Sequence, residues 1–135
     1  MLPIIIPLIL IGSSVLLICL GGHLASGKVP QNPHYGFRVP LTLRSRAAWD
    51  AANIHYGLWA IVAGLVSLPI GIWILVSRPG LDGVWLYTGV LLFLLLCGIY
   101  PSLKRAQRAE RRERELDAAE SGMPGLDDER EQPRH

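Results

Sequence analysis

Three stretches of the chain contain no Lys, Arg, Asp or Glu and are otherwise strongly apolar: residues 1–27, 51–77 and 83–103. A helix needs about 20 mostly apolar residues to cross the roughly 30 Å of hydrocarbon in a bilayer. Within lipid, every backbone N–H and C=O group must be satisfied inside the protein, which favours helices for single segments. The pattern therefore predicts an all-α membrane protein with three transmembrane helices, at about 2–22, 57–77 and 84–103.

Charged side chains are concentrated at the other end of the chain. Of the 24 charged residues, 17 lie from Lys104 onward and only seven lie in the first 103 residues. A soluble fold needs charges over its whole surface, so this distribution excludes a soluble enzyme and a multidomain protein. We divide the chain into a membrane domain, a basic cytoplasmic helix rich in good helix formers and a disordered acidic tail, at residues 1–103, 104–120 and 121–135.

The distribution of Lys and Arg also predicts an orientation, because loops that stay in the cytoplasm carry an excess of these residues. The segment before the first helix has no Lys or Arg, the first loop has four and the second loop has one. The segment after the third helix has six up to Arg114. We expect a multi-pass protein of the plasma membrane whose N-terminus faces outside and whose C-terminus is cytoplasmic. The first helix should be retained, because it lacks the basic start of a cleaved signal peptide and is too long for one.

Small residues recur along the second predicted helix at alternating steps of three and four. We call this set the small-residue seam: Gly57, Ala60, Gly64, Ser67 and Gly71. This spacing places the seam on one helix face, and small faces allow membrane helices to approach closely. We expect the seam to pack against the first or third helix, and contact with a second copy in a homo-oligomer is the alternative.

The loop between the first two helices, residues 31–57, is the least apolar part of the membrane domain. Pro33 and Pro40 exclude a long helix through its first half, whereas Thr42 or Ser45 can cap a helix that follows. Four residues after this point recur at helical spacing: Trp49, Ala52, Asn53 and Tyr56. We therefore predict a short interfacial helix that leads into the second transmembrane helix.

The same loop contains the spaced pattern N-x3-G-x-R-x-P-x-T-x2-S-x3-W-x3-N-x3-G. Its nine positions are Asn32, Gly36, Arg38, Pro40, Thr42, Ser45, Trp49, Asn53 and Gly57. This pattern resembles the signature of the SdpI-type (immunity protein) family of small integral membrane proteins. One membrane helix before the motif and two after it agree with that family. One departure is Arg46-Ala47-Ala48, which stands where family members often have acidic residues.

The resemblance implies a protein that acts by binding rather than by catalysis. The founding member of the family protects a cell from a secreted antibacterial peptide and takes part in signalling by holding a repressor at the membrane. Besides the lipid bilayer, the implied partners are a peptide toxin or a cytoplasmic regulator. Our alternative interpretation is a structural or accessory subunit that packs its small-residue seam against a larger membrane complex.

The motif positions, together with Asp50, form our candidate binding residues. A guanidinium such as that of Arg38 can bind a phosphate or carboxylate through two parallel hydrogen bonds. Asp50 is the only acid in the loop, so Arg38, Arg44 and Arg46 are its candidate partners, and we favour Arg38.

The sequence predicts no catalytic, cofactor or metal site. The two carboxylates of the membrane domain, Asp50 and Asp82, belong to opposite sides of the predicted topology. Three histidines of the membrane domain do not match a trusted metal-ligand spacing: His23, His34 and His55. Acids interrupt the basic run after Lys104, so we do not expect nucleic-acid binding.

Overall fold

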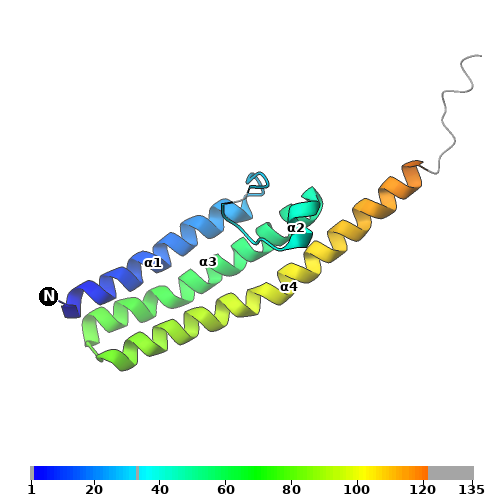
Figure 1. Ribbon diagram of the computed structural model, residues 1–135. Coiled ribbons are helices and arrows are strands. Elements are labelled where there is room, and N and C mark those ends of the chain that lie inside the picture. Colours follow the sequence, from blue (N-terminus) through cyan, green and yellow to red (C-terminus); the bar gives the residue numbers. More distant parts are fainter. Residues whose placement is uncertain (1, 33, 122–135) are drawn as a thin grey trace, which may run out of the picture.

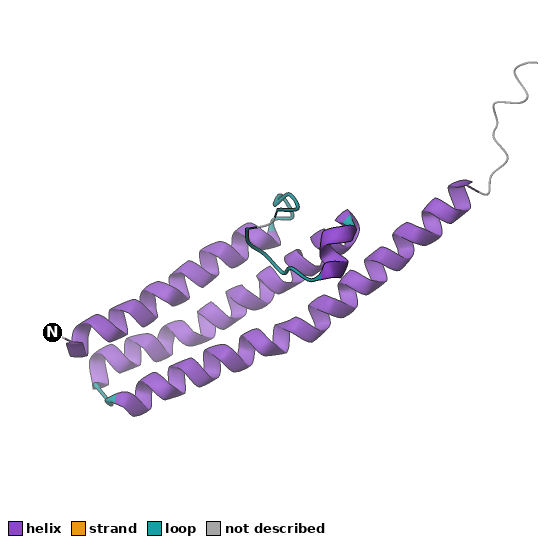
Figure 2. Ribbon diagram, viewed as in Figure 1, coloured by secondary structure: helices purple, strands orange, loops and turns teal. Residues whose placement is uncertain are grey.

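The computed structural model of the chain describes residues 2–32 and 34–121. It contains four helices: α1 (Leu2–Ala25), α2 (Pro40–Arg44), α3 (Arg46–Ser77) and α4 (Leu81–Ser121). The three long helices lie side by side, with α3 between α1 and α4, and each runs antiparallel to its neighbour in the chain (Figure 1). The loop between α1 and α3 folds over one end of this bundle, where it carries the short α2 (Figure 2).

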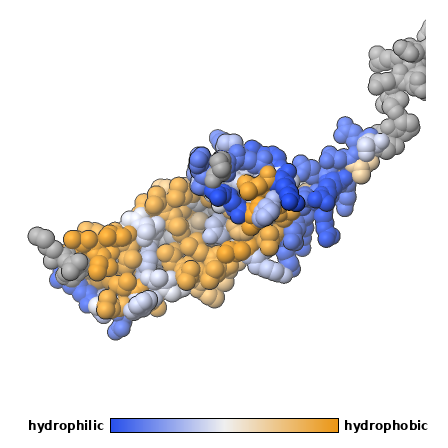
Figure 3. Space-filling view, viewed as in Figure 1, coloured by the Kyte–Doolittle hydropathy of each residue, from blue (hydrophilic) through white to orange (hydrophobic). Residues whose placement is uncertain are grey.

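The predicted fold class is confirmed. Each of the three long helices is long and apolar enough to cross a membrane, and a short helix lies between the first and second. Apolar side chains cover the helices along most of the bundle, whereas polar ones gather over the loop and the far part of α4 (Figure 3). We call the end of the bundle that carries the loop and this extension the basic end.

Two helices are longer than the apolar pattern predicts. Helix α3 starts at Arg46 rather than near residue 57, so the turns expected to lead into the second span belong to the same continuous helix. Helix α4 has 41 residues, and at 1.5 Å per residue it is about 62 Å long, roughly twice the thickness of the hydrocarbon core. It therefore includes the helical extension predicted after residue 103; the tail predicted at 121–135 lies, beyond Ser121, outside the described residues.

The small-residue seam faces α1, and all five of its members are buried. At the closest approach, a Cβ atom added to Gly57 would lie 2.6 Å from the backbone oxygen of Gly21 and 2.6 Å from the backbone nitrogen of Ala25. A Cβ at Gly64 would lie 2.8 Å from the backbone oxygen of Ser14. The glycines thus allow the two backbones to come into direct contact, which is how small residues serve helix packing in membranes.

Helix α4 packs on the opposite side of α3 and also reaches α1 through one tyrosine. Gly98 receives the ring of Trp59, with a built Cβ only 2.9 Å from the Cβ of that tryptophan. Tyr87 is 1% exposed, and its hydroxyl lies 2.7 Å from Ser14 Oγ and 2.7 Å from the carbonyl oxygen of Leu10. A buried phenol needs such partners, and here they join α4 to α1.

Candidate functional site

The motif begins with a tight turn that precedes α2. The Asn32 side-chain oxygen accepts hydrogen bonds from the backbone N–H groups of His34 (3.0 Å) and Tyr35 (2.9 Å), an arrangement typical of asparagine in turns. Gly36 follows with a φ of +115°, a conformation that side chains other than glycine's rarely adopt. A Cβ there would also lie 2.6 Å from Asn53 Oδ1, so this turn needs glycine for both reasons.

Asn53 and Trp49 attach this turn to α3. Asn53 is 2% exposed; its Oδ1 accepts the backbone N–H of Phe37 at 2.6 Å and its Nδ2 donates to the carbonyl of Trp49 at 3.0 Å. Trp49 is fully buried, and its indole N–H donates to the carbonyl of Val29 at 3.0 Å. The two side chains therefore hold both ends of the loop against one face of α3.

Helix α2 is stabilised by a second set of bonds within the motif. Pro40 stands at its start, where the missing N–H costs nothing. Thr42 Oγ1 accepts the backbone N–H of Val39 at 3.0 Å and donates to the carbonyl of Phe37 at 2.9 Å. The side chain of Gln31 donates to the backbone carbonyl of Thr42 at 2.9 Å. This glutamine, which the sequence pattern did not single out, thus connects the start of the loop to α2.

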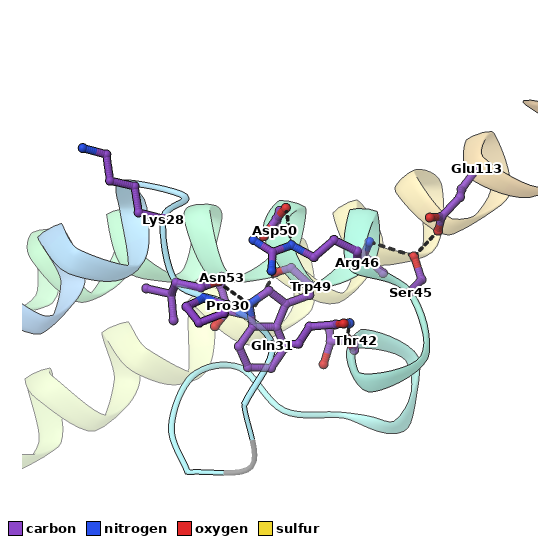
Figure 4. A network of polar contacts seen from close by, with 12 residues as sticks. Lys28, Pro30, Gln31, Thr42, Ser45, Arg46, Trp49, Asp50, Asn53 and Glu113 are labelled. Carbon is purple, nitrogen blue, oxygen red and sulfur yellow. Dashed lines mark hydrogen bonds and ion pairs between the residues drawn. The ribbon is translucent and has the colours of Figure 1, made fainter.

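Ser45 caps α3 and also connects the loop to the extension of α4 (Figure 4). Its hydroxyl accepts the backbone N–H of Ala48 at 3.1 Å and donates to the carboxylate of Glu113, 68 residues away in the sequence. An apolar cluster lies beside this bond and contains Phe37, Ala48, Ala52 and Ala106. The loop, the start of α3 and the extension of α4 therefore share one small core.

The structure corrects our preferred partner for Asp50. Arg46 Nε donates to Asp50 Oδ2 at 2.9 Å, one helical turn away on α3, where we expected Arg38. Residues four apart on a helix are neighbours, and α3 includes both of these residues because it starts at Arg46. The pair is partly exposed, with side-chain exposures of 49% and 34%, so it adds little stability.

Within residues 34–38 of the loop, three side chains are exposed: His34, Tyr35 and Arg38. The ring of Tyr35 stacks on that of His23 at the end of α1, with centroids 6.2 Å apart and planes 16° apart. Four buried motif side chains form hydrogen bonds that hold the loop together and against the bundle: Thr42, Ser45, Trp49 and Asn53. Arg38 and Pro40 are instead the two motif residues with exposed side chains, so they are the most accessible to a partner.

The chain matches the model of a known protein family. The family model described as the SdpI/YfhL protein family matches residues 28–102, which is more than half of the chain. The matched region begins at the loop and includes α2, α3 and the membrane part of α4. No curated protein and no solved structure matches the chain.

Proposed function

Because the chain belongs to the SdpI/YfhL protein family, we propose that this membrane protein acts by binding, in tolerance to an antibacterial peptide toxin or in membrane-linked signalling. The observation that carries the proposal is the family match, which covers the whole motif loop. The packing of the loop supports it, because a loop held by buried bonds presents its exposed residues in a fixed arrangement. Preorganised surfaces of this kind lose less conformational entropy when a partner binds.

Arg38 is the residue that we propose contacts the partner. It is exposed on the loop, three residues after the exposed Tyr35, and its planar guanidinium can bind a carboxylate or phosphate bidentately. The buried motif residues have a different task in this proposal, since they shape the loop that presents Arg38. The alternative of an accessory subunit rested on the small-residue seam, and that surface is covered by α1 in the bundle.

Survival under challenge with cell-envelope peptides tests the proposal. Cells that lack the chain should be more sensitive than cells that carry it, and equal survival would refute the tolerance function. Arg38→Lys keeps the charge but not the planar fork, so it should reduce protection although the protein still accumulates in the membrane. Arg44→Lys is the matched control, because Arg44 is also an exposed loop arginine but lies outside the motif. Full protection by both variants would show that position 38 needs only a positive charge.

We also propose that the basic end faces the cytoplasm of a plasma membrane, with the N-terminus outside. The excess of Lys and Arg in the loop and in α4 supports this orientation. In a background without Cys19 and Cys97, Asp82→Cys should react with a membrane-impermeant thiol reagent in intact cells. Ser121→Cys should react only after the cells are opened. Labelling of the Ser121 variant in intact cells would reverse the proposed topology.

A further inference from the structure

A groove runs between the first turns of α3 and the extension of α4 at the basic end. Its volume is about 790 Å³. One wall is formed by α3 and consists of small and apolar residues, which end at Ile54 and Leu58, together with His55. The opposite wall is a stripe along α4 with the spacing i, i+3 and i+7: Arg105, Arg108 and Arg112. The groove therefore has a row of guanidinium groups on its α4 wall and mainly apolar side chains on its α3 wall.

The charge of the groove is positive and is not neutralised by the acids described around it. Glu113 is the one acid in its lining, and its carboxylate accepts the hydrogen bond from Ser45. The neighbouring Glu110 pairs with Arg114, outside the groove. Within residues 2–32 and 34–121, none of the three groove arginines forms a salt bridge. Three exposed guanidinium groups on one helix face favour an anionic ligand with several oxygen atoms.

The position of the groove along the bundle identifies the kind of anion. Arg105 follows directly on Lys104, the first charged residue after the apolar part of α4, so it lies at the boundary of the hydrocarbon region. Ile54 and Leu58 are 36% and 49% exposed although both are large and apolar. An apolar surface that continues from a row of arginines into the membrane matches a molecule with a phosphate head and acyl chains. Basic pockets between membrane helices are known to hold such head groups.

We propose that this groove binds one anionic phospholipid of the surrounding leaflet, such as phosphatidylglycerol. Arg105 and Arg108 bind its phosphate, Arg112 extends the positive surface above it, and the first acyl carbons lie on Ile54 and Leu58. The bound lipid fills the space between α3 and α4 beside the core that holds the motif loop. The proposal does not depend on the function assigned to the loop.

Native mass spectrometry of the purified full chain in mild detergent tests the proposal. Titration with phosphatidylglycerol should give one retained lipid per chain, and phosphatidylcholine at the same concentration should be lost. The triple variant Arg105→Gln, Arg108→Gln, Arg112→Gln should bind phosphatidylglycerol at least about tenfold more weakly, since each charged hydrogen bond contributes roughly that factor or more. Glutamine keeps a high helix propensity, so α4 should remain folded.

A second triple variant separates a defined site from general attraction to an anionic surface. It removes the same number of charges from other faces of the same helix: Lys104→Gln, Arg111→Gln and Arg114→Gln. Binding within about twofold of the wild type supports the groove, because general attraction falls with each basic residue wherever it lies. Equal losses in the two triple variants would overturn the proposal.

Two further results would also overturn it. Displacement of phosphatidylglycerol by an equal concentration of glycerol 3-phosphate would show a site for a free anion rather than for a lipid. Binding that appears only after residues 122–135 are deleted would make the acidic end of the chain the occupant of the groove. Unchanged binding in both experiments supports the lipid.

Discussion

Two adjacent glycines in α1 provide a sharp test of the close contact between α1 and α3. A Cβ added to Gly21 would lie 2.7 Å from the backbone oxygen of Gly57 and 2.9 Å from the backbone nitrogen of Ile61. A Cβ added to Gly22 would meet no atom within 4 Å. The same substitution, Gly→Ala, therefore tests a crowded and an open position one residue apart in one helix.

The magnitudes follow from two opposing effects. Alanine is favoured over glycine in a helix by about 0.5–1 kcal/mol, and this gain applies at both positions. At Gly21 the methyl group meets backbone atoms, which cannot move by rotation of a side chain, so the helices must separate. Inserting a methyl group into a tightly packed site costs about 1–3 kcal/mol. Gly22→Ala should therefore be neutral or stabilising, and Gly21→Ala should be less stable than it by about 1–3 kcal/mol.

The midpoint of thermal unfolding in one detergent, followed by loss of the monodisperse species, measures this difference. Gly21→Ala should unfold several degrees below Gly22→Ala at equal protein concentration. Equal midpoints would mean that α1 and α3 do not approach as closely in the membrane as the structure indicates. That result would refute the packing argument for the whole seam.

Two further predictions concern the same bundle and the loop above it. Gly64→Leu should lower the amount of protein in the membrane, because its side chain would enter the space held by the Ser14 carbonyl. The control Leu65→Ile changes a 54% exposed position and should have little effect on the amount of protein. Equal protein levels for the two variants would place the seam against lipid. Trp49→Phe should lower stability by about 1–3 kcal/mol in the same thermal assay, because it leaves a buried carbonyl without its indole donor. Trp73→Phe is the control, since Trp73 is 45% exposed, and a similar effect of the two changes would contradict the buried role of Trp49.

The sequence was sufficient to predict the membrane class because the physical signal is long and simple. Uncharged runs of 20 residues or more have few other uses in proteins. The seam was likewise visible as a spacing of small residues, but spacing does not specify the partner helix. That choice depends on the complementary face of α1, where Gly21 meets Gly57.

The start of α3 shows where the apolar pattern is insufficient. Hydropathy marks the part of a helix that lies in lipid, and the eleven residues from Arg46 to Tyr56 are mixed in polarity. The signal for the true start was Ser45 as a cap, and Ser45 was one of the two candidates. This helix start also explains the pair of Arg46 and Asp50, because residues four apart are neighbours when both lie in the same helix.

The contacts between Ser45 and Glu113, and between Gln31 and Thr42, could not be predicted from local pattern. Each joins residues from different elements, and Glu113 looked like one of several charges on an exposed helix. The motif residues were singled out for binding, and most of them turned out to have bonding partners within the chain as well. Whether they also contact a partner stays a prediction, which the Arg38 and Arg44 variants address.

The shared core at the basic end has a consequence for biosynthesis. Ala106 completes the cluster of Phe37, Ala48 and Ala52, but it emerges from the ribosome long after them. Glu113, the partner of Ser45, is synthesised later still. The first two spans can associate through Gly21 and Gly57 as soon as both are inserted. The loop, in contrast, reaches its final packing only after the third span has entered the membrane and its extension has been synthesised. A nascent chain that stops shortly after residue 103 should therefore already hold its paired helices while the loop is still open to proteases.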